Sequence, residues 1–336
     1  MRKIIFWVLY TISMVLIPLA VLEIAVRFTH SPLHVPLPPA PYCKMEHLPY
    51  SNRPHFAFMR RSLEFAYEHR TNSQGFRDVE HTFEKPDGVF RVLGLGDSFT
   101  EGVGAQLSDT YLSRFAAGWR AAPPNDKKIE MIQAGIAGYD TKSERLMLEH
   151  YGMRYDPDLV TVGFFSNDLK EALVGVDYEI SKEGYLLGHE GHQGGPLLYW
   201  LYLRSGLARI LISHFAAYRA QSVLEDYLRN EKAWKKVEQE YVKMQKFLEP
   251  AGVPLVVINI PASPPWTRDH AHVSQRFGEM CKTLNLHCVD MFPLMRDHED
   301  YASLYWKQDY HCTPKGYDFI AESLFAYARS HPELLS

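Results

Sequence analysis

The sequence has few cysteines and no excess of basic residues. Its 336 residues include 4 cysteines, with no C-x-x-C pair and no Cys/His ligand spacing, which argues against a structural zinc site or a disulfide-built scaffold. The 36 Lys and Arg residues are balanced by 40 Asp and Glu residues, and the net charge of −4 disfavours nucleic acid as a partner. Hydrophobic residues make up 46% of the chain, which excludes a disordered protein.

Charge is also missing from one long run near the N-terminus. The residues from Ile4 to Leu22 carry no charge and would span about 28 Å as a helix, close to the roughly 30 Å hydrocarbon core of a bilayer. A cleaved signal peptide is the alternative, although its apolar region is usually shorter, about 7–15 residues. Arg2 and Lys3 precede the run and predict a cytoplasmic N-terminus, so the rest of the chain is expected outside the cytoplasm.

These features predict four segments. Residues 1–3 form a cytoplasmic tip and residues 4–26 a transmembrane signal anchor. Residues 27–55 are expected to be a linker, because their many prolines disfavour helix and favour an extended chain. Residues 56–336 form the folded domain.

Within that domain, short apolar runs alternate with helix-like stretches. Strands are expected at 90–95, 128–133, 159–165, 253–260 and 287–290, and helices at 109–120, 141–154 and 232–248. This alternation predicts an α/β fold with three layers, α/β/α, around a central parallel sheet. Two helix starts carry local signals. Thr141 and Glu144 are spaced as a capping box, and Thr313 precedes a proline at the first helical position.

The alternation stops between Leu169 and about Lys232, which predicts a largely helical insertion. Residues 197–220 fit either a helical cap packed on the domain or an amphipathic helix resting on the membrane surface. The aromatic residues Tyr199, Trp200 and Tyr202 fit either packed core or faces that stack on sugar rings. Because the insertion follows a strand end, we expect it to wall the substrate pocket and to set specificity.

Several common ligand motifs are absent. The chain has neither G-x-G-x-x-G nor G-x-x-x-x-G-K-[ST], so a nucleotide-binding domain is a remote alternative, and it also lacks the G-x-S-x-G elbow. In an open parallel sheet, ligands bind beyond the carboxyl ends of the strands. The residues that follow each expected strand are therefore the candidates for a site.

Three strand ends and one C-terminal loop carry suitable residues. Ser98 follows the first expected strand in a glycine-rich turn, Gly138 follows the second, and Asn167 follows the third. Asp309 and His311 lie on a loop before the last helix. A histidine oriented by a carboxylate can take a proton from a serine nucleophile, and backbone N–H groups with a neutral amide can bind an oxyanion.

These residues resemble the four sequence blocks of the SGNH or GDSL hydrolases. The blocks match, in order, Gly96-Asp97-Ser98, then Gly138, then Asn167-Asp168, then Asp309 with His311. The resemblance covers about residues 56–336 and implies a flavodoxin-like topology and a serine esterase without metal or cofactor. It implies catalytic roles for Ser98, His311 and Asp309, and an oxyanion hole made by Ser98, Gly138 and Asn167.

The segment before the first expected strand also resembles the membrane-anchored bacterial branch of that family. Its residues 72–78 read Asn-Ser-Gln-Gly-Phe-Arg-Asp, and we interpret Asn72, Gly75 and Arg77 as scaffold around the site. The resemblance implies a periplasmic domain that acts on O-acyl or O-acetyl groups of a cell-surface glycan or lipid.

Two positions depart from the family pattern. The last block is Asp309-Tyr310-His311, one residue shorter than the common Asp-x-x-His, and Gln308 occupies the usual Asp position. A Ser/His dyad is therefore an alternative to a triad. Phe165 stands where the family has a glycine, and its side chain is expected to narrow the pocket.

Other readings remain open on the sequence alone. An O-acyltransferase would use the same site, and a catalytically silent module that binds glycan or assembly partners would keep the same fold. Cys281 and Cys288 lie at the end of an expected helix and the start of the strand at 287–290, so an oxidising compartment would permit a disulfide between them.

Overall fold

The computed structural model describes residues 2–28, 41–62, 64–175, 178–180, 186–188, 195–208, 210–212, 215, 226–266 and 268–335. Their centre is a parallel sheet of five strands, β5 (Val89–Gly96), β6 (Lys128–Gln133), β7 (Leu159–Phe164), β10 (Leu255–Asn259) and β11 (His287–Asp290). The strand order is β11-β10-β7-β5-β6, and every neighbouring pair is parallel. In order of first appearance this is the flavodoxin-like pattern 2-1-3-4-5, which confirms the predicted fold class.

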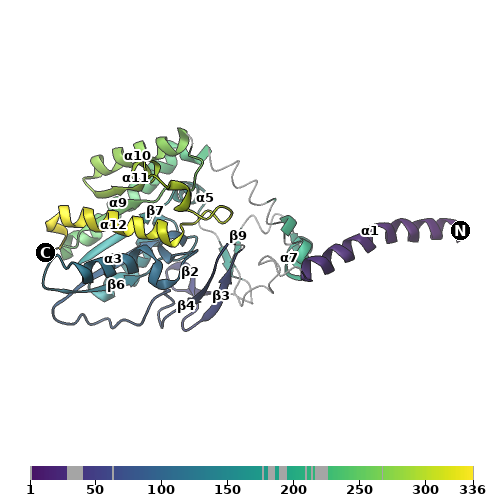
Figure 1. The fold of residues 1–336 in the computed structure, drawn as a ribbon, viewed down its shortest axis with the longest axis horizontal. Coiled ribbons are helices and arrows are strands. Elements are labelled where there is room, and N and C mark those ends of the chain that lie inside the picture. The colour runs from purple at the N-terminus through teal and green to yellow at the C-terminus, as the bar shows by residue number, and fades with distance from the viewer. Residues whose placement is uncertain are drawn as a thin grey trace.

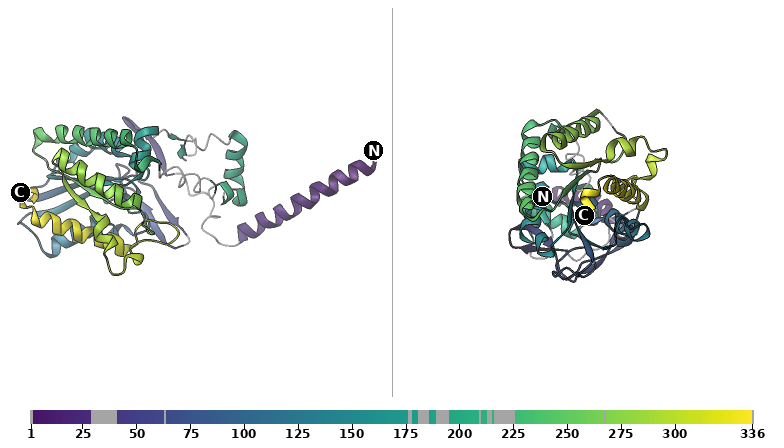
Figure 2. Two further views of the ribbon diagram at one scale, coloured as in Figure 1. Left: turned by 90° about the horizontal axis from the view of Figure 1, so that it is seen from above. Right: turned by 90° about the vertical axis from the view of Figure 1, so that its left-hand side faces the viewer.

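Helices cover both faces of the sheet (Figures 1 and 2). One face packs on α3 (Tyr111–Ala121), α11 (Met291–Arg296) and α12 (Pro314–Ser330), and the other on α4 (Thr141–His150), α5 (Asn167–Val174), α9 (Glu231–Leu248) and α10 (Arg268–Leu284). In α9, Trp234, Val237, Tyr241, Met244 and Leu248 recur every three or four residues and are all buried. This apolar stripe explains why the helix lies flat on the sheet.

The two expected helix starts had different outcomes. Thr313 caps α12 as predicted, because its Oγ1 accepts the Gly316 N–H at 3.2 Å. The predicted capping box of α4 is wrong, since Asp140 is the N-cap and accepts the Ser143 N–H at 2.9 Å. Glu144 instead points inward and is 1% exposed. Helix α4 also ends at His150, ahead of a short 3₁₀ turn at Gly152–Tyr155.

The expected linker is shorter than predicted. Residues 29–40 lie outside the described residues, but β1 (Tyr42–Met45) and β2 (Leu48–Asn52) form an antiparallel hairpin. Tyr50 of β2 is fully buried and lies edge-on to Tyr139, with ring centroids 5.3 Å apart. Proline density reports only local backbone preference, whereas burial of this ring stabilises the hairpin on the domain. A second hairpin follows, β3 (Ala57–Arg61) and β4 (Ala66–Arg70).

The described part of the insertion is only partly helical. It contains an antiparallel pair, β8 (Tyr178–Ile180) and β9 (Leu186–Gly188), and the helix α7 (Gly195–Arg204). Trp200 is exposed, so it is not packed core, and Tyr202 is half-buried. The side chain of Tyr199 and residues 216–225 lie outside the described residues.

The N-terminal helix α1 (Arg2–Phe28) projects away from the domain (Figure 1). It is the one candidate membrane span among the described residues, with a mean hydropathy of 2.4 and no buried residue in its most apolar stretch. A disulfide joins Cys281 of α10 to Cys288 of β11, with Cα atoms 6.3 Å apart, so the bond left open by the sequence is formed.

Candidate active site

The predicted site residues lie along one edge of the sheet. Ser98 begins the short helix α2 (Ser98–Glu101) after β5, Gly138 follows β6, and Asn167 begins α5 after β7. Strands β6, β5 and β7 are neighbours, so all three residues emerge at adjacent carboxyl ends. The order of the sheet reverses between β5 and β7, which is the position where doubly wound folds bind ligands.

Ser98, His311 and Asp309 are joined by hydrogen bonds. His311 Nε2 lies 2.9 Å from Ser98 Oγ, and His311 Nδ1 lies 2.6 Å from Asp309 Oδ1. With a proton on Nδ1 donated to the carboxylate, Nε2 is left as the acceptor for the serine hydroxyl. All three side chains are partly exposed, so a substrate can reach them.

The short Asp-x-His spacing is accommodated by the backbone of Tyr310. Its φ is +70°, a left-handed conformation that turns the chain between Asp309 and His311. The loop is closed by the Trp306 N–H, which donates to His311 O at 2.9 Å. This geometry brings the Asp309 carboxylate to His311 Nδ1 despite the short spacing.

Glu64, which the sequence analysis missed, holds the backbone of this loop. Its carboxylate accepts N–H groups from Lys307 at 2.9 Å, Gln308 at 2.8 Å and Asp309 at 3.0 Å. Glu64 lies between β3 and β4, more than 240 residues earlier in the chain. No local pattern marks such a contact. A lone Glu between two short strands reads as an ordinary turn residue.

Gly138 occupies a turn that only glycine fits. Its φ is +82°, and a Cβ atom at this position would lie 2.6 Å from the hydroxyl oxygen of Tyr50. The same hydroxyl donates to Ala137 O at 2.8 Å, and the Tyr139 hydroxyl donates to Tyr50 O. The β1–β2 hairpin, which lies within the expected linker, therefore stabilises the Gly138 turn through Tyr50.

Asn167 and the helix start of α2 offer hydrogen-bonding groups at the same edge. The side-chain oxygen of Asn167 is buried and has no hydrogen-bond partner among the described residues. The Ser98 N–H is at the first position of its helix, where no intrahelical acceptor exists. Within the described chain, neither Asn167 nor Gly138 is hydrogen-bonded to Ser98, His311 or Asp309.

Phe165 lines the site through aromatic contacts. Its ring centroid lies 4.6 Å from that of Phe99, and the Phe99 ring lies 4.9 Å from the His311 ring. Phe165, Phe99 and His311 therefore form a row of contacting rings that ends beside Ser98.

Comparison with known proteins identifies the family of the chain. A family model described as the GDSL-like lipase/acylhydrolase family matches residues 95–319, about two thirds of the chain. The chain belongs to this family. It is accordingly a carboxylic ester hydrolase. A comparison with curated proteins gave no match.

Several solved structures are similar to this hydrolase. The lipase Lip_vut3 from a goat rumen metagenome is 17% identical with a TM-score of 0.48, covering 71% of this chain and 97% of its own. The lipase/acylhydrolase from Enterococcus faecalis is 13% identical with a TM-score of 0.45, covering 72% and 96%. A catalytic mutant of Axe2, an acetylxylan esterase from Geobacillus stearothermophilus, is 14% identical with a TM-score of 0.42, covering 71% and 93%.

Behind Ser98 the hydrolase buries several carboxyl groups. Asp97 is 1% exposed, and burial raises its pKa to about 6, although its Oδ1 accepts the Phe99 N–H at 2.9 Å. Burial and mutual repulsion also raise the pKa values of Glu144 and Asp168 well above their usual range. Glu144 and Asp168 are therefore expected to be largely protonated at neutral pH, which lowers the cost of burying them, whereas Asp97 is mostly ionised there.

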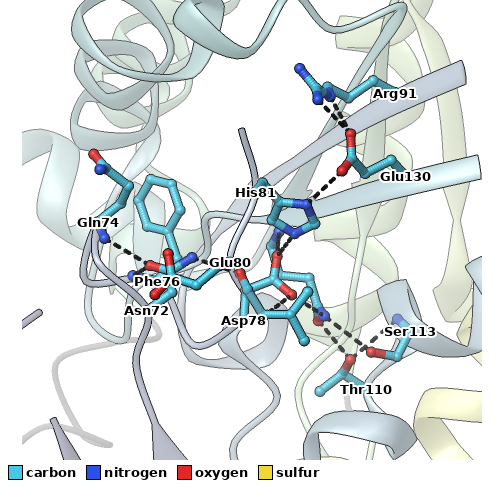
Figure 3. A network of polar contacts seen from close by, with 12 residues as sticks. Asn72, Gln74, Phe76, Asp78, Glu80, His81, Arg91, Thr110, Ser113 and Glu130 are labelled. Atoms are coloured by element: carbon cyan, nitrogen blue, oxygen red, sulfur yellow. Dashed lines mark hydrogen bonds and ion pairs between the residues drawn. The ribbon is translucent and has the colours of Figure 1, made fainter. Parts of the chain in front are cut away.

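The segment before β5 is tied into the scaffold of the hydrolase. Figure 3 shows Asp78 bonded to His81, His81 to Glu130, and Glu130 to Arg91, at 3.0, 3.0 and 2.6 Å. Asp78 also accepts the backbone N–H of Gln133 at 2.8 Å. Burial alone would lower the pKa of His81, but its contacts with the carboxylates of Asp78 and Glu130 outweigh burial and raise the pKa. This network joins the segment to β5 and β6.

The side chains of Asn72 and Arg77 form hydrogen bonds within the same scaffold. Asn72 accepts the N–H groups of Gln74 and Phe76 at 3.0 Å, as part of the network in Figure 3. Arg77 is 1% exposed and donates to the carbonyls of Glu101, Gly102 and Ala105 at 2.7–2.9 Å. These contacts match their interpretation as scaffold.

Two other features lie apart from Ser98. A hollow of about 670 Å³ is bordered by α4, α5 and α9, and none of the predicted site residues lines it. Among the described residues, His287, His331 and Glu333 form the one group whose possible metal-ligand atoms lie within 4.8 Å of one another. His287 is the first residue of β11, so this group lies at the amino edge of the sheet, opposite the site.

Proposed function

We propose that this protein is a membrane-anchored serine esterase that uses Ser98, His311 and Asp309 outside the cytoplasm. The observation that carries the proposal is the chain of hydrogen bonds from Ser98 Oγ through His311 to Asp309, at 2.9 and 2.6 Å. Family membership supplies the reaction class, the hydrolysis of a carboxylic ester.

In the first half-reaction, Ser98 Oγ attacks the ester carbonyl carbon while its proton passes to His311 Nε2. Asp309 orients the imidazole and stabilises the imidazolium that forms. The N–H groups of Ser98 and Gly138 and the amide of Asn167 bind the oxyanion, and each such donor contributes about 2.7–4 kcal/mol to the transition state. The intermediate then expels the alcohol, which takes the proton from His311, and leaves an acyl-Ser98 ester.

In the second half-reaction, water replaces the alcohol. His311 takes a proton from the water as its oxygen attacks the acyl carbon, and the second intermediate collapses to a carboxylic acid. Ser98 Oγ recovers its proton from His311, so the enzyme returns to its starting state.

The cellular location proposed for this reaction is the outer face of the cytoplasmic membrane, facing the periplasm. Residues 4–26 would span the bilayer, residues 1–3 would remain cytoplasmic, and the domain would follow the segment at 27–55, with the insertion at about 169–232 beside the substrate. The uncharged run in α1 and the Cys281–Cys288 disulfide both support this placement, since disulfides persist in oxidising compartments. Acylated cell-surface glycans or lipids are the substrates proposed for such a site.

The proposal is tested by hydrolysis of p-nitrophenyl acetate with the full chain in detergent. We expect Ser98→Ala and His311→Ala each to lower kcat by at least about 10³-fold, because serine and histidine act as one unit. Asp309→Asn should lower it by at least about 100-fold. The control is Ser323→Ala, in α12 and outside the site, which should retain wild-type activity.

Wild-type activity in Ser98→Ala or His311→Ala would contradict the proposal. A loss below about tenfold in Asp309→Asn would replace the triad by a Ser/His dyad.

A further inference from the structure

Hydrogen bonds fix the insertion to the end of α1. Glu23 follows directly after the uncharged run that ends at Leu22. Its carboxylate accepts three hydrogen bonds, from Ser205 Oγ at 2.8 Å, Gly206 N at 3.0 Å and Leu207 N at 3.0 Å. Arg27, which pairs with Glu23 at 2.8 Å, also donates to Arg204 O at 2.9 Å. Glu23 thus caps the helical residues 206–208 of the insertion.

This junction sets the depth of the insertion relative to the proposed membrane. Hydrocarbon would surround α1 as far as Leu22, so Glu23 and Arg27 lie at the level of the lipid headgroups. Residues bonded to Glu23 must lie at the same level. Figure 1 shows α7 beside the C-terminal end of α1, between that helix and the domain.

The insertion presents apolar side chains at this level. Leu197 and Trp200 of α7 are 68% and 56% exposed, and Leu211 in the helical residues 210–212 is 62% exposed. Arg204, between them, is also exposed. Tryptophan and leucine beside an exposed arginine are typical of a helix that lies in the bilayer interface, with the basic group at the headgroups.

The catalytic edge of the sheet faces the same side. In Figure 1, α12 begins on the side of the domain nearer α1 and runs toward the C-terminus on the opposite side. His311 precedes the first residue of α12 by three positions. The insertion itself leaves the sheet just after Asn167, through α5.

We propose that residues 195–208 and 210–212 rest on the outer surface of the bilayer that α1 spans and hold the catalytic edge toward that bilayer. The esters reached in this way are those of amphiphilic molecules embedded in the membrane. This inference rests on the proposed anchor and esterase, and it specifies the surface from which the substrate comes.

A spin label tests the membrane contact without using activity. The full-length protein carries the background change Cys43→Ser and is placed in vesicles of phosphatidylethanolamine and phosphatidylglycerol. A nitroxide is attached to Leu211→Cys. In the matched control it is attached to Phe247→Cys, near the end of α9 and at the amino edge of the sheet. At position 211 we expect dissolved oxygen to relax the label more than a water-soluble nickel chelate does. At position 247 the order should be reversed. Equal exposure of both labels to the nickel chelate would overturn the proposal.

A second measurement tests the source of the substrate. The variant Leu197→Ser/Leu211→Ser should lower apparent kcat/KM at least fivefold for a long-chain ester embedded in the same vesicles. Hydrolysis of p-nitrophenyl acetate should be unchanged, and Phe247→Ser should behave as wild type with both esters. Equal rates of wild type and double variant on the embedded ester would overturn the proposal, and so would a parallel loss with both esters.

The two proposals fail separately. Activity retained by Ser98→Ala would refute the esterase site and leave the spin-label result standing. A water-exposed label at position 211 would refute the membrane contact while Ser98 remains the nucleophile.

Discussion

At the scale of single residues, the buried carboxyl group of Asp97 makes the stability of the protein depend on pH beside the nucleophile. Its pKa rises from 3.8 to about 6 because it is buried. Between these values the folded chain keeps a proton that the unfolded chain has lost, so the free energy of unfolding falls as pH rises from about 4 to about 6. The full effect is on the order of 3 kcal/mol.

Asp97→Asn removes this titration and retains an oxygen for the Phe99 N–H. We therefore expect the stability of the variant, relative to wild type, to increase by on the order of 3 kcal/mol between pH 4 and pH 7. Urea unfolding across this pH range measures the difference. The exposed Asp87→Asn serves as control and should follow wild type. A stability difference between Asp97→Asn and wild type that is independent of pH would contradict the assignment.

A second residue-scale prediction concerns the contact between Gly138 and Tyr50. Gly138→Ala places a side chain at φ +82° and 2.6 Å from the Tyr50 hydroxyl oxygen, so it should lower the free energy of unfolding by at least about 1–2 kcal/mol and reduce kcat. Tyr50→Phe alone loses one hydrogen bond, worth about 1 kcal/mol.

The double variant should be less destabilised than the sum of the two single changes, because removal of the hydroxyl makes room for the new methyl group. Chemical denaturation of the three variants measures this coupling. Strict additivity would show that the hydroxyl does not restrict position 138.

The sequence predicted the position of those residues that a local pattern marks. Ser98 and Asn167 each follow a strongly apolar strand, and His311 precedes a helix that begins with a marked cap, so their places in the sheet could be read in order. Tyr50 and Glu64 could not be found in this way. Each acts on a loop far away in the chain, and no pattern around it indicates the partner.

At the scale of elements, the β3–β4 hairpin supports the catalytic loop through one side chain. Glu64→Gln replaces the carboxylate that accepts three backbone N–H groups by a neutral amide. The amide nitrogen is itself a donor, so it would lie against some of these N–H groups without accepting a hydrogen bond from them. Hydrogen bonds to charged groups contribute about 1.5–3 kcal/mol each, so Asp309 and His311 should lose their fixed position. We expect kcat for p-nitrophenyl acetate to fall at least about tenfold.

Glu68→Gln is the matched control, because Glu68 lies in the same hairpin and its carboxylate bonds only the exposed Arg70 among the described residues. It should retain wild-type kcat. Fluorophosphonate labelling of Ser98 should slow in parallel with kcat in Glu64→Gln if Glu64 positions the loop. Unchanged kcat would show that the loop keeps its geometry without Glu64.

The elements themselves were predictable to different degrees. Strands β6 and β11 have the predicted bounds, and β7 is buried along its whole length, which produces a continuous apolar run that is easy to recognise. The start of α4 was misread because Glu144 fits a capping box by spacing, whereas in the fold it lies among buried acids. The burial of Glu144 in the folded protein, rather than its spacing from Thr141, determines its role. In the same way, burial of Tyr50 rather than local proline content determines that the β1–β2 hairpin forms.

At the scale of the whole molecule, the central question is which side of the membrane holds the domain. A reporter that is active only outside the cytoplasm, fused at Ser336, should be active, and the protein should stay in the membrane fraction after a carbonate wash. We expect this result because the positive charges of Arg2 and Lys3, which precede the uncharged run, favour a cytoplasmic N-terminus. Recovery of a shortened soluble protein would show that residues 4–26 are a cleaved signal.

The order of the parallel sheet explains how residues far apart in the sequence, including those of the proposed site, reach one edge of the fold. Ser98, Gly138 and Asn167 come from three consecutive strands that are neighbours in space, and the loop before α12 brings His311 to the same edge. The alternation of strands and helices made this much predictable. The insertion was predictable only in part, because its bonds to Glu23 of α1 join residues far apart in the sequence.

The most direct test of the account is covalent labelling of the full chain with a fluorophosphonate, followed by mass spectrometry of its peptides. Only a serine hydroxyl activated by a neighbouring base reacts readily with this probe. We predict a single adduct on Ser98, strongly reduced in His311→Ala and unchanged in Ser323→Ala. A folded protein that carries no adduct, or carries it on another serine, would contradict the assignment of Ser98 as the nucleophile.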